Sequence, residues 1–241
     1  MPNTYDLSVF EDGLKELNIQ LSEQQMQQFI CYYEMLVEWN KVMNLTGITE
    51  WDEVVLRHFL DSLSIAKVCD MEKIETVIDV GTGAGFPGIP LLIAFPHLKI
   101  TLLDSLKKRI GFLDAVIEKT GLEGAKTIHG RAEDFAKQAD YRENYQLCVS
   151  RAVADLRTLS EYCLPFVDKS GKFISYKSGK IEEEMEYSKK AISILGGKLT
   201  ACEKFMLANT DIERSFIIIE KTKNTPKKYP RKAGLPSKEP L

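Results

Sequence analysis

From residue 76 onward, short apolar runs rich in β-branched residues alternate with segments of helical periodicity, and this alternation limits the folds open to the chain. Strands are expected at Thr76–Val80, Ile100–Asp104, Ala125–His129, Gln146–Ser150 and Lys172–Tyr176. Helices are expected between and after them, near Ile89–Phe95, Lys107–Thr120, Asp155–Leu164 and Ile181–Leu195. The alternation predicts an α/β fold whose mostly parallel sheet is covered by helices on both faces.

The end of the predicted sheet differs from its beginning. Two apolar runs, Lys198–Leu207 and Arg214–Lys221, follow each other with no helical segment between them. Consecutive strands joined by a short loop pair antiparallel, so we expect the sheet to end in an antiparallel hairpin. This arrangement is typical of the Rossmann-like core of class I S-adenosylmethionine-dependent methyltransferases, whereas a complete dinucleotide-binding Rossmann domain ends in another parallel strand.

Residues 1–70 carry helical periodicity and no strand signal. Apolar side chains recur at spacings of three and four residues at Phe29, Ile30, Tyr33, Leu36 and Val37. Ser22 and Gln25 predict a capping box for this helix, and Thr49 can begin another one. We therefore expect an N-terminal helical cap (1–70), a Rossmann-like methyltransferase core (71–222) and a basic C-terminal tail (223–241).

Positive charge is concentrated at the end of the chain, although the formal net charge is −3. The last 21 residues contain one acid, Glu239, and seven basic residues, namely Lys221, Lys223, Lys227, Lys228, Arg231, Lys232 and Lys238. A basic segment on an acidic body can dock a polyanion. The alternatives are a solvated end that aids solubility, or a structural strap in which Pro230–Pro236 packs against the core.

Composition excludes several classes of protein. No apolar run approaches the length of about 18 residues needed for a membrane span, and the N-terminus lacks the pattern of a secretory signal, so we expect a cytoplasmic protein. The five cysteines are odd in number and far apart, so we expect reduced thiols and no metal site. Neither a Ser-His-Asp order nor a P-loop is present, so the sequence gives little support for a hydrolase. We also expect a monomer.

The strongest local signal is a glycine loop that follows a buried strand and opens a helix. Asp79 and Val80 end the strand, and the loop runs from Gly81 to Gly88. Glycines allow a tight turn and a close approach of the backbone to a ligand. The loop alone leaves a dinucleotide open as the ligand, because Gly83, Gly85 and Gly88 have the G-x-G-x-x-G spacing.

Acidic residues at three successive strand ends favour a cationic ligand over a dinucleotide. Asp79 would repel a pyrophosphate but suits the ammonium group of S-adenosylmethionine, directly or through water. Asp104, which ends the second strand, has the spacing of an acid that meets ribose hydroxyls, a feature that NAD would share. After the third strand, Glu133 and the backbone around Ala132 are available to the adenine end.

Other polar residues give weaker signals. Arg151 ends the fourth strand, where substrate and methyl donor meet in this architecture, but it can also pair with a neighbouring acid. Lys177 ends the fifth strand in the segment Tyr176-Lys177-Ser178-Gly179, with the same ambiguity. In the cap, Arg57, His58 and Asp61 lie within about one helical turn and could face the cleft together. The alternative, which we favour for His58, is a solvated or structurally satisfied histidine.

Motifs along nearly the whole chain resemble the bacterial ribosomal RNA small subunit methyltransferase G family, also called glucose-inhibited division protein B. The glycine loop is shared by many methyltransferases, whereas the Arg-His…Asp-Ser segment and the Pro-Arg-Lys-Ala-Gly tail are more specific. The resemblance rests on Trp39-Asn40-Lys41, Asn44-Leu45-Thr46, Arg57–Ser62, Asp79–Gly88, Leu103-Asp104-Ser105, Lys108-Arg109, Arg131-Ala132-Glu133, Ser150-Arg151-Ala152 and Pro230–Pro236.

The resemblance implies transfer of a methyl group from S-adenosyl-L-methionine to N7 of guanine 527 in 16S rRNA, with the rRNA or the small ribosomal subunit as partner. It also implies that the cofactor contacts Gly81, Phe86, Ala132, Glu133 and Arg151. Asp104 is added from the ribose argument, and no catalytic residue is assigned. Alternatives are a non-catalytic RNA-binding or ribosome-assembly protein that keeps the fold, and an NAD-dependent oxidoreductase.

Overall fold

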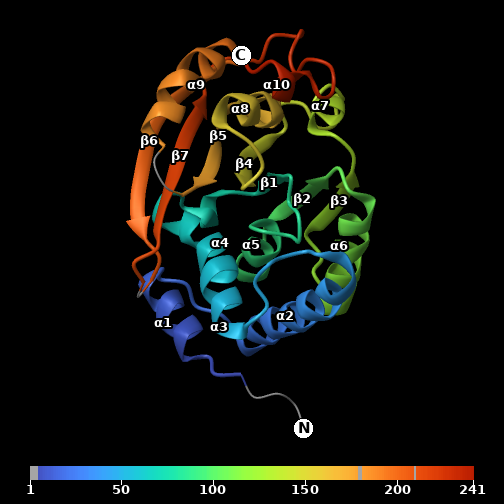
Figure 1. Cartoon of the computed structure of the whole chain (residues 1–241), viewed down its shortest axis with the longest axis vertical. Helices are drawn as coiled ribbons and strands as arrows, with labels where there is room; N and C mark the ends of the chain where they lie inside the picture. Colours follow the sequence, from blue (N-terminus) through green and yellow to red (C-terminus); the bar gives the residue numbers. More distant parts are fainter. Residues whose placement is uncertain (1–4, 179–180, 209) are drawn as a thin grey trace.

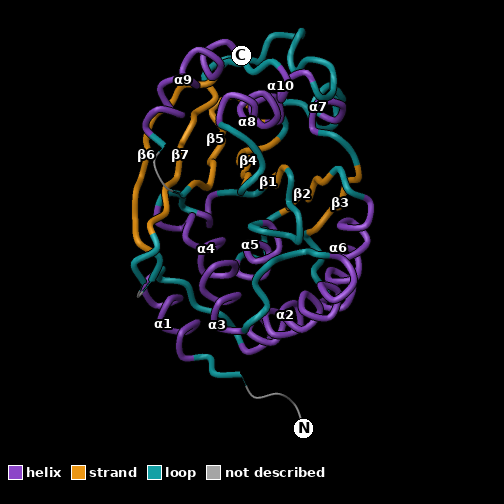
Figure 2. Tube along the Cα trace, in the orientation of Figure 1, coloured by secondary structure: helices purple, strands orange, loops and turns teal. Residues whose placement is uncertain are grey.

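A computed structural model describes residues 5–178, 181–208 and 210–241, and its centre is a seven-stranded sheet in the order β3-β2-β1-β4-β5-β7-β6 (Figures 1 and 2). The strands are β1 Thr76–Val80, β2 Lys99–Asp104, β3 Ala125–His129, β4 Tyr145–Arg151, β5 Val167–Lys177, β6 Gly197–Met206 and β7 Glu213–Lys221. The first five strands are parallel, and β7 pairs antiparallel with β5 and β6. The predicted class I methyltransferase-like sheet is confirmed.

Helices cover both faces of the sheet (Figure 1). One layer contains α1 Ser8–Glu16, α2 Glu23–Met43, α3 Trp51–Val54, a π-helical segment Val55–Leu60, α4 Asp61–Leu63, α5 Gly88–Ala94 and α6 Lys107–Thr120. The other contains α7 Ala132–Phe135, α8 Leu156–Cys163, α9 Glu182–Ile194 and α10 Leu235–Lys238. Two separate hydrophobic clusters fill the spaces between these layers and the sheet. The carboxyl ends of the parallel strands lie together at one edge of the sheet.

Two predicted boundaries differ from the structure by more than one residue, for local reasons. β5 begins at Val167 rather than Lys172, because a bulge opposite Tyr145 and Leu147 lets the polar segment after Val167 join the strand. The helix expected from Thr49 begins at Trp51, and its N-cap is Glu50, which forms no side-chain cap. The helix then passes into the π-helical segment, which the side-chain periodicity did not indicate.

The N-terminal helices and the core share one hydrophobic cluster. Phe29 and Phe59 of the cap are fully buried and pack in the same cluster as Leu102 and Phe112 of the core. The predicted capping box at Ser22 is confirmed. A fully buried tyrosine on α2, Tyr32, donates a hydrogen bond from its hydroxyl to a carbonyl oxygen in the glycine loop. The cap therefore supports the glycine loop through a hydrogen bond from α2.

The end of the chain packs on α8 rather than extending into solvent. Tyr229 and Pro236 are buried, and the guanidinium of Arg231 pairs with Glu161 of α8 at 2.7 Å. The strap interpretation, made for Pro230–Pro236, is confirmed, and we call residues 226–241 the C-terminal strap. Lys221 does not belong with the exposed cations, because its buried ammonium donates to the carbonyl oxygens of Leu164 and Val167. Within the described ranges, no helix has the length and apolarity needed to cross a bilayer.

We predict that Tyr32→Phe lowers the free energy of unfolding by about 1–2 kcal/mol, because the carbonyl of Ala84 loses a buried donor. Urea unfolding at pH 7.5 measures this loss. Tyr187→Phe is the matched control, since Tyr187 is exposed on α9. Equal stability of the two variants would mean that the cap does not support the loop through this bond.

Candidate functional site

The backbone of the glycine loop is held in conformations that favour glycine. Gly81, Gly83 and Gly85 have φ values of 73°, 63° and 101°. The N–H groups of Gly81 and Thr82 both donate to the carbonyl of Leu103 at the end of β2, at 2.8 and 3.1 Å. A Cβ atom added at Gly81 would lie 2.6 Å from a methyl group of Val153. The loop therefore needs glycine at this position for both conformation and space.

Asp79 stabilises the glycine loop through two hydrogen bonds. Its Oδ2 accepts hydrogen bonds from the Thr82 hydroxyl at 2.7 Å and from the Gly88 N–H at 2.9 Å. Its Oδ1 is buried with no hydrogen-bond partner among the described residues. Burial raises the pKa of Asp79 to about 6, against the opposing effect of these two hydrogen bonds. The carboxyl group has no exposed surface, and its expected contact with the ammonium of a ligand, directly or through water, stays a prediction.

Four of the predicted cofactor-contacting residues line one cavity of about 130 Å³ at the carboxyl ends of β1, β2 and β3. After the ligand end that the sequence analysis expects here, we call it the adenosine-side cavity. Its lining includes Gly81, Asp104, Ala132 and Glu133. Asp104 is 3% exposed. Its Oδ1 accepts from the Leu106 N–H, and its Oδ2 accepts from the Gly83 N–H at 3.0 Å and from Arg109 at 3.2 Å. Oδ1 keeps a lone pair for a ligand hydroxyl.

The other two predicted residues, Phe86 and Arg151, line a neighbouring cavity of about 190 Å³ that also includes Gly81. The guanidinium of Arg151 lies over the Phe86 ring at 5.1 Å, and His58 stacks on the same ring at 4.5 Å between centroids. The predicted set is thus divided between two cavities that share Gly81. The glycine loop joins them.

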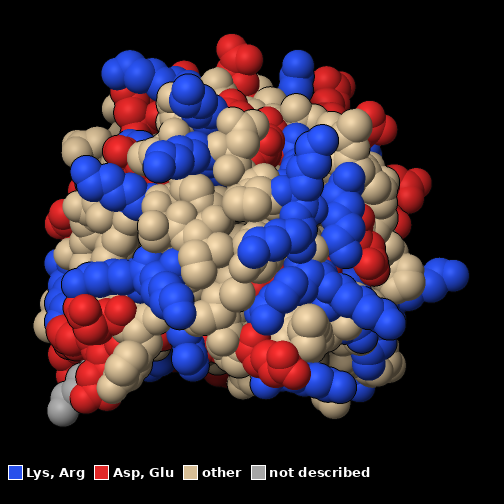
Figure 3. All heavy atoms as spheres, turned by 90° about the horizontal axis from the view of Figure 1, so that it is seen from above, with Lys and Arg blue, Asp and Glu red and all other residues tan. Residues whose placement is uncertain are grey.

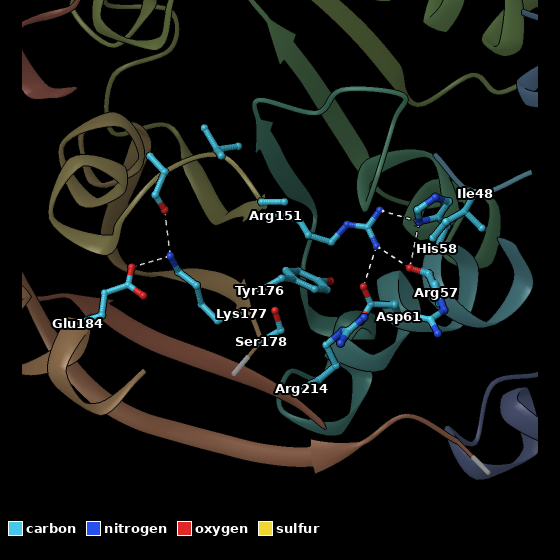
Figure 4. A pocket seen from close by; sticks show the side chains of 13 residues that line it. Ile48, Arg57, His58, Asp61, Arg151, Tyr176, Lys177, Ser178, Glu184 and Arg214 are labelled. Atoms are coloured by element: carbon cyan, nitrogen blue, oxygen red, sulfur yellow. Dashed lines mark hydrogen bonds and ion pairs between the residues drawn. The ribbon is translucent and has the colours of Figure 1, made fainter. Parts of the chain in front are cut away.

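Arg151 is fixed by the helical cap (Figure 4). Its Nη1 donates to Asp61 at 2.7 Å and to the carbonyl of Arg57 at 3.1 Å, and its Nη2 lies 3.4 Å from Nδ1 of His58. The side chains of Arg57, His58 and Asp61 line the same cavity, as the cap motif suggested. This cavity has a volume of about 590 Å³, and its lining includes Arg151. Because the sequence analysis expects the substrate to meet the methyl donor at Arg151, we call it the substrate-side cavity.

Sequence reasoning missed Arg214, which completes the cluster. Its Nε donates to Oδ1 of Asp61 at 2.9 Å, while Arg151 occupies Oδ2. Asp61 is 3% exposed, so the two guanidinium groups offset the cost of burying its charge. Two cations would compete for one carboxylate in water, but here they approach from different strands. Only the pairing of β5 with β7 brings Arg214 to this place.

Lys177 lies on the opposite wall of the substrate-side cavity. Its ammonium donates to Glu184 at 2.6 Å and to the carbonyl of Ala154 at 2.9 Å (Figure 4). Gly179, the last residue of the predicted strand-end segment, lies outside the described residues. The loop that Lys177 holds includes Ala152, whose φ of 57° is strained for a residue with a side chain. This strained loop separates the adenosine-side and substrate-side cavities, because Val153 lines both.

Burial and the nearby Arg151 cation lower the pKa of His58 to about 4. The imidazole is therefore neutral near pH 7. Its Nε2 lies 2.8 Å from the Thr46 hydroxyl and its Nδ1 lies 3.0 Å from the Arg57 carbonyl. A neutral ring that stacks on Phe86 and contacts two cap segments can position neighbouring groups, but it cannot supply a proton at this pH. No cluster of His, Cys, Asp and Glu in the described part of the chain could hold a metal ion.

Comparison with known families identifies the chain. The family model for rRNA small subunit methyltransferase G matches residues 25–215. The chain belongs to this family. It is 52% identical over 236 residues to the ribosomal RNA small subunit methyltransferase G of Lachnoclostridium phytofermentans, a match that covers 98% of each chain. It is 49% identical over 236 residues to the protein of the same name from Bacillus subtilis, covering 98% of this chain and 99% of that one.

Solved structures with low sequence identity share the fold of this family member. A SAM-dependent O-methyltransferase from Thermotoga maritima aligns with a TM-score of 0.51 at 17% identity, covering 78% of this chain and 72% of that one. TrmN from Thermus thermophilus aligns with a TM-score of 0.50 at 13% identity, covering 69% and 53%. At this identity the likeness concerns the fold alone.

We predict that the His58 imidazole stays neutral down to about pH 5. Its folded pKa lies below the ordinary value of 6.5, so the unfolded chain takes up a proton first and the free energy of unfolding falls as the pH drops from about 6.5 to about 4. Long-range ¹H–¹⁵N spectra follow the ring, with the signal assigned by its absence in His58→Gln. Arg151→Gln should raise the midpoint, whereas a wild-type midpoint near 6.5 contradicts the assignment.

Proposed function

We propose that this chain transfers a methyl group from S-adenosyl-L-methionine to N7 of guanine 527 in 16S rRNA. The observation that carries the proposal is the cavity of about 190 Å³, whose lining includes Gly81 of the adenosine-side cavity and Arg151 of the substrate-side cavity. We call the place where these cavities meet the junction. A methyl donor and a nucleotide need to meet at such a junction. The specific base and position are carried over from the family resemblance.

The chain's residues fit the donor. We propose that the adenine end lies against Ala132 and Glu133, that the ribose hydroxyls bind Asp104, and that the methionine end passes Gly81 toward Phe86 and Arg151. The positive φ of Gly81 supports a close approach of the ligand to the backbone. Bound S-adenosylmethionine supplies an electrophilic methyl group on a sulfonium.

The residues near the junction suit a reaction without a general base. Guanine N7 carries a free lone pair, so no proton has to leave before the nucleophile attacks, and alignment of the reacting atoms supplies much of the rate enhancement. The neutral His58 is consistent with this requirement. Because Asp61 neutralises part of the Arg151 charge, the site can hold Arg151 beside a cationic N7-methylguanine product.

Two alternatives are tested directly by binding. An NAD-dependent oxidoreductase would bind NAD in the same loop, and a non-catalytic RNA-binding protein would bind RNA without using the donor. Calorimetry with NAD and with S-adenosylmethionine distinguishes the first alternative from the proposed function, because an oxidoreductase would bind NAD and a methyltransferase would bind S-adenosylmethionine. The three-part division of the chain at residues 70 and 222 stays a prediction. We further propose that the protein acts in the cytoplasm as a monomer.

We predict that Arg151→Gln lowers methyl transfer to RNA at least about 100-fold, because it removes a cation and its bonds to Arg57, His58 and Asp61 at the junction. Arg157→Gln is the control, since Arg157 lies on α8 with a half-exposed side chain that pairs with Asp155. Single-turnover transfer of labelled methyl to small subunits measures both, and mass spectrometry of the rRNA identifies the base. Normal turnover per folded Arg151→Gln molecule, or a methyl group elsewhere than on guanine N7, would reject the proposal.

Exposed lysines of the strap and the residues before it are candidates for binding phosphates. Lys and Arg side chains lie on both sides of a neutral region when the molecule is viewed from the end that carries α9 and α10 (Figure 3). The exposed lysines of this part of the chain are Lys223, Lys227, Lys228, Lys232 and Lys238. Arg231 and Lys221 are engaged inside the protein and do not belong to this set.

We predict that changing these five lysines to glutamine makes the slope of log RNA affinity against log salt shallower. The expected change is about 0.7–0.9 for each phosphate that a lysine neutralises in the wild-type complex. Filter binding of 16S rRNA between about 50 and 200 mM KCl measures the slope. Affinity for the methyl donor should not change. An unchanged slope would assign RNA binding to another face.

A further inference from the structure

The C-terminal strap is anchored by one buried acid. Glu161 of α8 is 1% exposed and accepts hydrogen bonds from the backbone N–H of Arg231 at 2.7 Å and from Nε and Nη2 of its guanidinium at 3.0 and 2.7 Å. Nη2 also donates to the carbonyl of Glu239 at 2.8 Å, which closes the strap on itself. Charge-assisted bonds of this geometry are strong and directional. Arg231 therefore determines where the strap lies on α8.

Three residues beyond this anchor, the strap contacts the wall of the adenosine-side cavity. The backbone N–H of Gly234 donates to Oε1 of Glu133 at 2.8 Å. Glu133 is 3% exposed and lines the cavity, as does Tyr162, whose hydroxyl has Ser237 of the strap as a hydrogen-bond partner. The strap thus contacts two lining residues from behind.

Glu133 needs this external support because the helix that carries it is short. α7 spans only Ala132–Phe135, a single turn, and one turn has little stability of its own. Gly234 has a φ of 81°, a left-handed conformation that aims its N–H at Glu133. The orientation of Glu133 therefore depends on a backbone conformation far away in the sequence, at a separation of 101 positions.

We propose that the C-terminal strap positions Glu133 for binding the adenosine end of the methyl donor, with Arg231 and Gly234 as positioning residues. This inference rests on the proposed function, in which Glu133 meets the adenine. It separates the strap's role from RNA binding, because the bonds involve a paired arginine and a backbone N–H rather than the exposed lysines. Disturbing the strap weakens binding of any ligand that carries adenosine, whatever is attached to the 5′ carbon.

The sharpest test uses two glycines with the same strain. Gly234 and Gly121 both have positive φ, 81° and 69°, and a Cβ added to either meets no described atom within 4 Å. Alanine at either position therefore adds similar backbone strain without a clash. Gly121 caps α6, whose following strand β3 begins at the far edge of the sheet, so Gly121→Ala controls for lost stability.

Calorimetry with 5′-methylthioadenosine and with S-adenosylhomocysteine reports the adenosine end alone and the whole ligand. Gly234→Ala should weaken both by the same factor, roughly three- to tenfold, the range for the net contribution of one ordinary hydrogen bond, because the Gly234 N–H is displaced rather than removed. Gly121→Ala should bind both as the wild type does. With RNA saturating, Gly234→Ala should raise KM for the donor while kcat at saturating donor stays unchanged, a division that general instability would not produce.

A second set of three variants tests the anchor and controls for misfolding. Arg231→Gln should weaken both nucleosides about tenfold, Arg231→Lys should restore part of the loss, and Lys232→Gln should leave both unchanged. If the wild type binds methylthioadenosine and folded Gly234→Ala or Arg231→Gln binds it equally well, the role of the strap is overturned. The proposed function is then not affected. A loss for S-adenosylhomocysteine but not for methylthioadenosine also overturns the role of the strap. A wild type that binds neither nucleoside overturns the proposed function as well.

Discussion

The buried carboxylate of Asp61 links three parts of the chain that lie far apart in the sequence. It binds Arg151 at the end of β4 with one oxygen and Arg214 at the start of β7 with the other, across 90 and 153 positions. A buried carboxylate requires partners for both oxygens, so neither arginine can be spared at low cost. The helical cap, the parallel half of the sheet and the terminal hairpin are therefore positioned relative to one another at the point where the cavities meet.

Local sequence patterns predict the sheet well because each buried strand requires its own run of apolar residues. β1 and β3 agree with their expected boundaries, and the glycine loop lies where the buried strand ends. The six predicted cofactor-contacting residues gather around one edge because parallel strands bring their carboxyl ends together. Contact with the cofactor itself stays a prediction. The arrangement of the cavities follows from topology rather than from any single motif.

The remaining features depend on partners that no local pattern specifies. Asp79 looks like a ligand-binding acid in sequence, and the structure adds that its carboxyl accepts bonds from Thr82 and Gly88. Arg214 and Glu161 bind partners that lie 70 or more positions away in the sequence, so their roles cannot be predicted from their neighbours in the chain. For the same reason, a count of basic residues overestimates the exposed positive charge at the C-terminus. Lys221 and Arg231 form ion pairs with Glu143 and Glu161 of the same chain.

Several of the linking bonds end on main-chain carbonyl oxygens rather than on side chains. Tyr32 binds the carbonyl of Ala84, Arg151 binds that of Arg57, and Tyr176 binds that of Ser62. Every amino acid offers the same carbonyl, so these three bonds survive substitution of the accepting residue. A one-residue insertion or deletion in the accepting segment moves the carbonyl away and removes them. Relatives can thus drift in the composition of these segments while their lengths stay constrained.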